Sequence, residues 1–278
     1  MPPLRHSGKA IHSHIDLCSY YEHHERMANR TDVVGSIGKG LRVLECFSAD
    51  APRLSISEVA AATGFDRATA RRCLLTLHEL GYADYDGKFF TLTARVLRLG
   101  TGALAGMPLA QMVQPWLDQL SEQIGQSCSV AILDDTDIVY VARAAQRRVM
   151  SIGLMPGSRL PAHCTSLGRV LLAALPTDQV RATLDRSNLA PRTRYSKTLP
   201  DEILAEIVLA RAQGFALVEQ EVELGLRSLA VPLVNSRGRV VAALNTGMAA
   251  VQTDLQMARQ AYLPALLRVQ DALQRVLR

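Results

Sequence analysis

The feature that most constrains this chain is a predicted pair of short helices joined by a tight turn. Ser55 and Glu58 have the spacing of a capping box at the start of a helix. Gly64 is placed to end that helix in the left-handed conformation, and Asp66 is placed to cap a second helix that stops at Gly81. Two helices separated by so short a turn are typical of a helix-turn-helix unit.

The second helix has an apolar side and a side of small and basic residues. At about 100° per residue, the apolar side groups Ala70, Cys73, Leu74 and Leu77. The opposite side and its flanks carry no acid. Cations near a helix start meet phosphates and guanine edges, and small residues let the backbone approach a DNA groove. Arginines alone would equally suit a solvated face of an ordinary helix. With the turn beside them, we predict double-stranded DNA contacts for Arg67, Ala68, Thr69, Arg71 and Arg72.

A hairpin is predicted directly after this helix, over residues 82–92. Two runs rich in aromatic and β-branched residues flank Asp86 and Gly87, a pair whose turn demands positive φ. A two-stranded wing behind a recognition helix indicates a winged helix-turn-helix, with Lys88 at the wing tip as a further DNA contact.

Apolar residues at helical spacing over 36–47 predict one more helix upstream. These elements together define a DNA-binding domain over residues 33–92, in which Ser57 adds a further predicted contact. Residues 93–107 are predicted to form a helical linker, capped by Thr93, whose apolar side is a candidate dimer surface.

Composition agrees with a two-domain protein of the reducing cytosol. The 278 residues suffice for two cores, and no apolar run approaches the roughly eighteen residues of a membrane helix. The five cysteines are odd in number and form no Cys-x-x-Cys pair, and no signal pattern opens the chain. The net charge of +5 is weak support for DNA binding, because residues 31–98 hold nine basic and eight acidic residues.

Residues 1–32 are predicted to be a disordered extension. They hold five of the seven histidines, and a metal could in principle be ligated by His12, His14, Cys18, His23 and His24. No periodicity would hold these ligands in place, so the pattern favours disorder and no metal or cofactor. Met27 is an alternative start, since regulator-like sequence begins only near residue 33.

Residues 108–278 read as a second domain of mixed helices and strands. Helices are predicted at 109–124, 166–174, 177–184, 201–213 and 254–277, and strands at 127–133, 138–143, 149–152, 215–221, 226–234 and 240–246. Strand triplets separated by helices indicate an antiparallel sheet with helices packed on it, a GAF-like sensor layout within an overall α+β fold. The chain has no Gly-x-Gly-x-x-Gly or Walker loop for a nucleotide.

From Gly35 to its C-terminus the chain resembles the isocitrate-lyase-regulator (IclR) family of bacterial transcription factors. The stretches that carry the resemblance are Ser57–Gly64, Gly157–Arg169 and Glu223–Pro232. The stretch Phe65–Leu74 resembles the branch that controls protocatechuate and β-ketoadipate pathway genes in aromatic degradation. An IclR-type regulator of another acid, such as glyoxylate or pyruvate, is the alternative.

The resemblance implies a homodimer or dimer of dimers that binds operator DNA and a small organic acid, with RNA polymerase as a further partner if it activates. It places the effector site at Met155, His163, Cys164, Thr165, Ser166, Glu219, Ser228, Asn245 and Thr246. Physical reasoning supports part of this set, because Ser166 opens a predicted helix and a helix start favours carboxylates. Arg143 or Arg159 could add a bidentate partner, although a surface position suits either equally.

An enzyme is the remaining alternative, since Cys164 beside His163 could suggest a nucleophile and its base. Adjacent residues usually point apart on an extended loop, and no third orienting residue is evident. We therefore expect no catalytic residues.

Overall fold

The structure, a computed structural model, describes residues 34–48, 51–106, 108–146, 153–251 and 255–277. The chain forms two compact units that divide between Gly106 and Met107. The strand predicted over 149–152, the histidine-rich extension and the alternative start at Met27 all lie outside the described residues.

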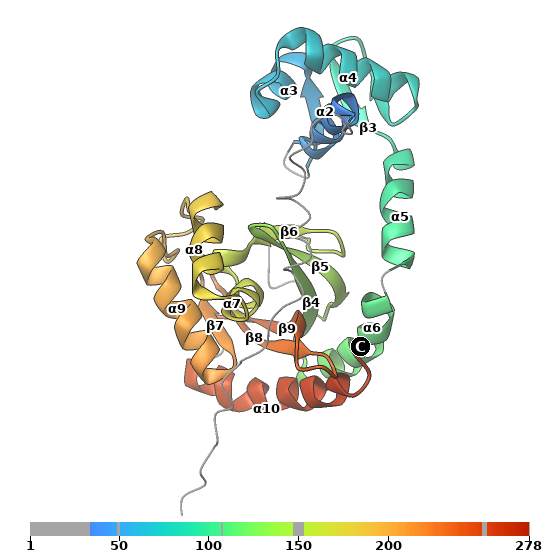
Figure 1. Ribbon diagram of the computed structural model, residues 1–278. Coiled ribbons are helices and arrows are strands. Elements are labelled where there is room, and N and C mark those ends of the chain that lie inside the picture. Colours follow the sequence, from blue (N-terminus) through green and yellow to red (C-terminus); the bar gives the residue numbers. More distant parts are fainter. Residues whose placement is uncertain (1–33, 49–50, 107, 147–152, 252–254, 278) are drawn as a thin grey trace, which may run out of the picture. The chain divides into compact units, whose positions relative to one another are not determined.

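The N-terminal unit is a helix-turn-helix with a small sheet (Figure 1). Its elements are α2 (Gly35–Glu45), β1 (Arg53–Ser55), α3 (Ile56–Thr63), α4 (Arg67–Glu79), β2 (Ala83–Tyr85), β3 (Phe89–Leu92), η2 (Ala94–Val96) and α5 (Leu97–Ala105). Val43, Leu74 and Phe90 are fully buried between them. The predicted linker is thus the short η2 and the helix α5.

The helix ends form as predicted. Ser55 and Glu58 make the reciprocal hydrogen bonds of a capping box, since the Ser55 hydroxyl accepts from the Glu58 N–H and the Glu58 carboxylate accepts from the Ser55 N–H. Gly64 has φ 72°, and the Asp66 carboxylate accepts from the Thr69 N–H at 2.8 Å. These caps fix the turn that orients α4.

The wing differs from its prediction in two respects. β1 joins it, so the sheet has three strands in the order β1-β3-β2. The turn is also displaced by one residue, because Asp86 and Phe89 close it and only Gly87 has positive φ. The Asp86 carboxylate instead accepts the N–H groups of Phe89 and Lys88, which lower its pKa to about 2. Asp86 is therefore the cap of the turn rather than one of its central residues.

The C-terminal unit is an antiparallel sheet flanked by helices. Its elements are α6 (Pro108–Ile124), β4 (Ser127–Asp134), β5 (Asp137–Ala144), β6 (Arg159–Pro161), η3 (Ala162–Cys164), α7 (Ser166–Ala173), α8 (Thr177–Arg186), α9 (Pro200–Gln213), β7 (Ala216–Glu219), β8 (Leu226–Val234), β9 (Val240–Ala249) and α10 (Leu255–Gln274). The strand order is β6-β5-β4-β9-β8-β7, and every pairing is antiparallel. The predicted α+β class, winged helix-turn-helix and helix-covered antiparallel sheet are confirmed; β6 was not foreseen.

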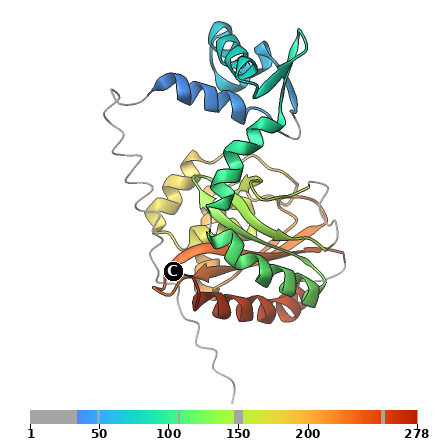
Figure 2. The same ribbon diagram turned by 90° about the vertical axis from the view of Figure 1, so that its right-hand side faces the viewer.

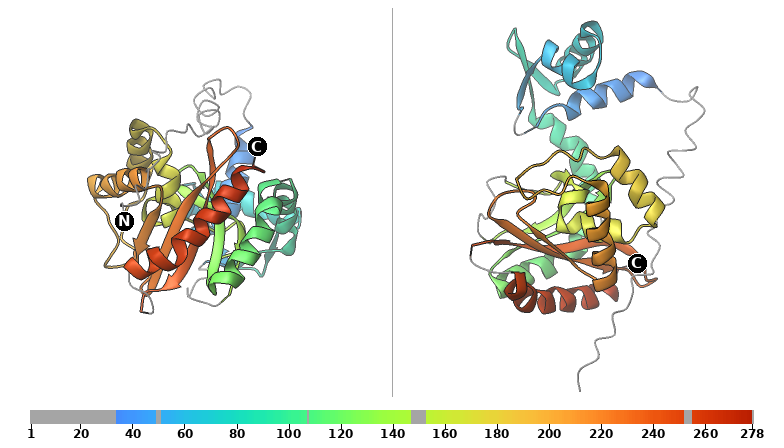
Figure 3. Two further views of the ribbon diagram at one scale, coloured as in Figure 1. Left: turned by 90° about the horizontal axis from the view of Figure 1, so that it is seen from below. Right: turned by 90° about the vertical axis from the view of Figure 1, so that its left-hand side faces the viewer.

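Helices cover both faces of this sheet. α6 and α10 pack on one face, where Figure 2 shows the two helices together below the strands and Figure 3 shows α10 running across them. α7 packs on the other face with α8 and α9 outside it. Alternate strand residues therefore enter two different cores.

A β-bulge in β5 changes which side chains reach each core. Val130 pairs with Ala142 and Ala131 with Tyr140, so Val141 has no partner in β4. Arg143 lies three positions after Tyr140, a spacing that places two side chains on opposite faces of a regular strand. The extra residue brings both to the face that carries α7.

Gly168 lets the start of α7 approach η3. A Cβ added at this position would lie 2.1 Å from the Ala162 carbonyl oxygen, which is main chain and has no rotamer to change. We predict that Gly168→Ala lowers the free energy of unfolding by about 1–3 kcal/mol or more. Urea unfolding followed by the fluorescence of Trp116, the single tryptophan, reports on this unit alone. Gly153→Ala, which meets nothing within 4 Å, should stay within about 0.5 kcal/mol of the parent. Equal stability of the two variants would contradict the packing described.

Candidate functional site

The outer side of α4 presents an unobstructed basic surface. Arg67, Ala68, Arg71 and Arg72 are all exposed. In the described part of the chain none of these arginines pairs with an acid, and the Arg72 guanidinium donates only to the Thr69 hydroxyl, at 3.3 Å. The charges therefore remain available to an anionic partner.

Thr69 takes a different place from the one expected. It is 7% exposed, and its hydroxyl donates to the Asp66 carboxylate at 2.7 Å. The same bond lowers the Asp66 pKa. A hydroxyl held this way supports the start of α4, and the contact of Thr69 with DNA stays a prediction.

The two remaining predicted DNA contacts lie on exposed surface. Ser57 is in the first turn of α3, and Lys88 is at the tip of the wing with its Nζ 5.0 Å from the centre of the Phe89 ring. Arg53 of β1 forms an ion pair with Asp86 at the same tip. That pair neutralises the carboxylate of Asp86, two residues before Lys88.

In the C-terminal unit a small cavity opens at the start of α7, against β5, β8 and β9. Its volume is about 40 Å³, and it is lined by Ser127, Tyr140, Arg143, Leu154, Leu160, Thr165, Ser166, Val222, Leu226, Ser228, Asn245 and Gly247. Four of the nine predicted effector residues are among them: Thr165, Ser166, Ser228 and Asn245. We call it the α7 cavity.

Ser166 supplies a polar group without a partner at the α7 cavity. The residue is fully buried, and within the described residues its hydroxyl has no hydrogen-bond partner. The preceding Thr165 is fully occupied, since its hydroxyl accepts from the Gly168 N–H at 3.0 Å and donates to the Pro161 carbonyl at 3.2 Å. A buried hydroxyl at a helix start is well placed to bind an anionic ligand.

Arg143 supplies a positive charge to the same cavity. Its Nη1 donates to the Ser129 hydroxyl at 2.9 Å, which fixes the guanidinium against β4. Tyr140 lies beside it, 4% exposed, and burial raises the pKa of its phenol to about 12, so the hydroxyl keeps its proton. The cavity thus combines a cation, hydroxyl groups and the apolar side chains Leu154, Leu160, Val222 and Leu226.

Arg159, the alternative to Arg143, lies elsewhere. It forms surface ion pairs with Asp134 and Asp137, across the turn that joins β4 to β5. Its guanidinium is therefore committed to two carboxylates and does not line the α7 cavity.

Five predicted effector residues do not line the cavity. Met155 is 63% exposed, and Glu219 pairs with Arg227 on the neighbouring strand. Thr246 follows Asn245 on β9 and so points to the opposite face, where its hydroxyl donates to the Ser127 carbonyl at 3.2 Å.

His163 and Cys164 are buried in η3 behind the lining. Burial raises the pKa of the Cys164 thiol to about 12 and lowers that of His163. A thiol that stays protonated is a poor nucleophile, which argues against the pair as a catalytic centre.

Seven lining residues were not predicted from the sequence: Ser127, Tyr140, Leu154, Leu160, Val222, Leu226 and Gly247. Leu160 belongs to the unforeseen β6, and Tyr140 depends on the bulge. Leu226 and Gly247 could have been predicted from Ser228 and Asn245. Residues two positions apart on a strand share a face, so Leu226 lies on the same face as Ser228, and Gly247 on the same face as Asn245.

Metal and membrane sites find no support in the part of the chain that the structure describes. No group of three or more His, Cys, Asp or Glu side chains gathers there at metal-binding distance. None of the helices described is long and apolar enough to span a bilayer.

Comparison with known proteins gives matches to both units. Residues 36–87 match the family described as "IclR helix-turn-helix domain", and residues 101–275 match "Bacterial transcriptional regulator IclR C-terminal". The Pca regulon regulatory protein of Pseudomonas putida is 41% identical over 237 residues, 85% of this chain and 81% of that protein. The p-hydroxybenzoate hydroxylase transcriptional activator of Acinetobacter baylyi is 37% identical over 237 residues, 81% of this chain and 88% of that protein.

Solved structures give the same match. An IclR family transcriptional regulator from Brucella abortus covers 91% of this chain and 96% of its own, with a TM-score of 0.77 and 25% identity. The inducer-binding domain of the PobR transcription factor from Acinetobacter, a double mutant in complex with 3-hydroxybenzoic acid, has a TM-score of 0.58 and 31% identity. It covers 62% of this chain and 100% of its own.

Proposed function

The chain belongs to the IclR family of bacterial transcriptional regulators, and from this premise we propose that it controls genes for the catabolism of aromatic acids. Membership makes it a ligand-responsive DNA-binding regulator and not an enzyme. The finer assignment is to acids of the protocatechuate and β-ketoadipate pathway. Its main support is the α7 cavity, where Arg143 and Ser166 meet apolar side chains.

A carboxylate suits the polar part of the cavity. A guanidinium can donate two parallel hydrogen bonds to a carboxylate, and the start of α7 adds a partial positive charge. The Ser166 hydroxyl, buried and without a partner among the described residues, would gain an acceptor. An acid bound here would therefore satisfy a group that the protein alone leaves unsatisfied.

An aromatic ring with hydroxyl substituents suits the remainder. Leucine and valine side chains offer ring contacts, while Ser228, Asn245 and Tyr140 offer hydrogen bonds to ring hydroxyl groups. Two relatives support this chemistry by name: the Pca regulon regulatory protein and the p-hydroxybenzoate hydroxylase activator.

The cavity volume favours a second candidate, a regulator of a smaller acid such as glyoxylate or pyruvate. Drug-sized ligands occupy pockets of about 300–1,000 Å³, whereas the α7 cavity measures about 40 Å³. An aromatic acid therefore requires the walls at Leu154, Val222 or Leu226 to move apart. Such a movement would also give the effector a conformational change to transmit.

Operator recognition is assigned to α4, with Arg67 and Arg71 as the contacts least engaged within the protein. Both are exposed, and neither forms an ion pair within the described residues. Arg72 is exposed as well but also contacts Thr69. Ala68 lets the helix approach the groove, and Ser57 and Lys88 would add contacts to the phosphate backbone.

Self-association is assigned to an apolar groove of the N-terminal unit. Residues of α2, α4, the turn after α4 and α5 line about 820 Å³ there, among them Ile37, Leu41, Leu80 and Leu99. Each of these four side chains is more than half exposed. Such a continuous apolar surface on a DNA-binding unit suits a second copy, since dimeric regulators bind paired half-sites.

The effector assignment is tested by a thermal-shift screen with protocatechuate, 4-hydroxybenzoate, β-ketoadipate, muconate, shikimate, glyoxylate and pyruvate. At a hundredfold excess over Kd, a true effector should stabilise the protein by about 2.7 kcal/mol. Arg143→Gln should weaken binding of an aromatic hit by about 1.5–3 kcal/mol, because a charge-assisted hydrogen bond is lost. Arg159→Gln is the matched control and should bind as the parent does. A response to glyoxylate or pyruvate alone would favour the second candidate.

The operator assignment predicts that Arg71→Ala weakens binding to the protein's own upstream DNA by roughly 1–3 kcal/mol and relaxes specificity at one base pair. Gel-shift titration at fixed salt measures this change. Arg181→Ala, an exposed arginine of α8 in the other unit, controls for the lost charge. Operator affinity unchanged in Arg71→Ala would mean that α4 does not read bases through this side chain.

The dimer assignment predicts that Leu41→Glu raises the dimer dissociation constant by about tenfold or more, because a carboxylate would be buried between copies. Sedimentation velocity over a concentration series gives that constant. Val208→Glu, an exposed apolar position on α9, should leave it unchanged. Equal association of both variants would place the interface elsewhere.

A further inference from the structure

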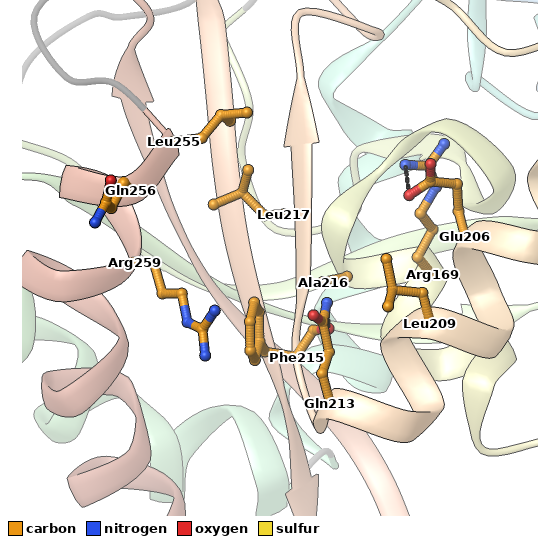
Figure 4. Close-up of a pocket in the computed structure, with 10 residues that line it drawn as sticks. All are labelled: Arg169, Glu206, Leu209, Gln213, Phe215, Ala216, Leu217, Leu255, Gln256 and Arg259. Carbon is orange, nitrogen blue, oxygen red and sulfur yellow. Dashed lines mark hydrogen bonds and ion pairs between the residues drawn. The ribbon is translucent and has the colours of Figure 1, made fainter.

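Arg169, on the first turn of α7, is the largest fully buried side chain of the described residues. Only 2% of it is exposed, although it carries a permanent charge. It ends the Gly157–Arg169 stretch that carries the family resemblance, yet the proposed function gives it no role. Figure 4 shows it crossing from α7 towards Glu206 on α9.

The Arg169 guanidinium contacts three groups. Its Nε donates to the His163 carbonyl at 3.2 Å, and its Nη2 donates to the Glu221 carboxylate at 2.8 Å. Its Nη1 lies 3.7 Å from Glu206, which also pairs with Lys197 at 3.0 Å. The cation is therefore fully engaged and serves the protein itself rather than a ligand.

Two of these contacts lead to two separate segments that line the α7 cavity. His163 belongs to the turn that continues into Thr165 and Ser166. Glu221 directly precedes Val222, which also lines the cavity. One side chain thus connects two cavity walls that are more than fifty residues apart in the sequence.

Glu221 is itself anchored on the side away from Arg169. Its carboxylate accepts the Lys197 N–H at 3.3 Å, and its carbonyl accepts the Ser196 hydroxyl at 2.7 Å. Burial raises the pKa of Glu221, and the charges of Arg169 and Lys197 offset only part of that rise. The wall at Val222 is therefore held at a defined distance from α7.

We propose that Arg169 and Glu221 are positioning residues for the effector site, holding the 163–166 and 221–226 walls together around the ligand. The proposal rests on the proposed function, because it assigns the α7 cavity to the effector. Stability alone is a poor reason for such a pair, since replacing a buried ion pair by apolar residues is often neutral or stabilising. What apolar residues cannot replace is the connection between the two walls.

The cost of a buried charge without its partner supplies the test, which uses the full-length protein. Arg169→Met leaves Glu221 buried without its cation, and it should unfold at clearly lower urea concentration than the parent. Arg169→Met combined with Glu221→Leu removes both charges and should recover most of that stability, while Glu206 keeps Lys197. Trp116 fluorescence follows unfolding. Arg181→Met with Asp201→Leu, an exposed pair between α8 and α9, is the matched control.

Two measurements on the stable double variant decide the proposal. Amide hydrogen exchange of residues 163–168 and 221–226 should be faster by about tenfold or more, with α10 unchanged. The Kd for protocatechuate, measured by calorimetry, should rise by about tenfold or more, which corresponds to about 1.4 kcal/mol. The control pair should change neither quantity.

Parental exchange rates in both walls, or a parental Kd with the ion pair removed, would overturn the proposal. If the double variant regained affinity for protocatechuate together with its stability, the ion pair would only support the fold. Absence of protocatechuate binding by the parent would instead exclude this acid as the effector, and the exchange rates would still decide the role of Arg169 and Glu221.

Discussion

The C-terminal unit depends on a helix with no solvent-exposed face. Every residue of α7 is buried, and the helix packs against η3, α9 and the central strands. Such a position requires that each polar group along the helix find a partner inside the protein. Thr165 caps the helix and Arg169 is neutralised by Glu221, so among the described residues of this helix only the Ser166 hydroxyl stays unsatisfied. The one unsatisfied polar group of this helix thus marks the proposed ligand site.

The N-terminal unit follows a different rule, because its function requires charges that the protein leaves unneutralised. The acids near α4 are used within the unit: Asp66 caps the helix, and Asp86 closes the wing turn and pairs with Arg53. Arg67 and Arg71 are left facing solvent. A segment that is almost neutral in total charge therefore still presents a basic surface, which a net charge or a pI does not reveal.

Local signals explain which predictions succeeded. The caps at Ser55 and Asp66, the end at Gly64 and most helices and strands depend on neighbours within a few residues, and these were read correctly. The wing turn was misplaced by one residue because Asp86 and Gly87 suit two turn registers, and the choice depends on pairing between β2 and β3. β1 and β6, three residues each, are too short to show a periodic pattern.

The sequence by itself determined the two domains' fold class, the recognition helix and the presence of a polar helix start at Ser166, because each follows from spacing along the chain. Only the tertiary structure decided which side chains meet at the cavity. The bulge at Val141 turns Arg143 towards α7, whereas acids across a turn hold Arg159 at the surface. Strand alternation admits Asn245 and excludes Thr246, and Glu221 meets Arg169 across fifty-two residues. Long-range pairing sets these choices, since a one-residue shift in register reverses every side chain of a strand.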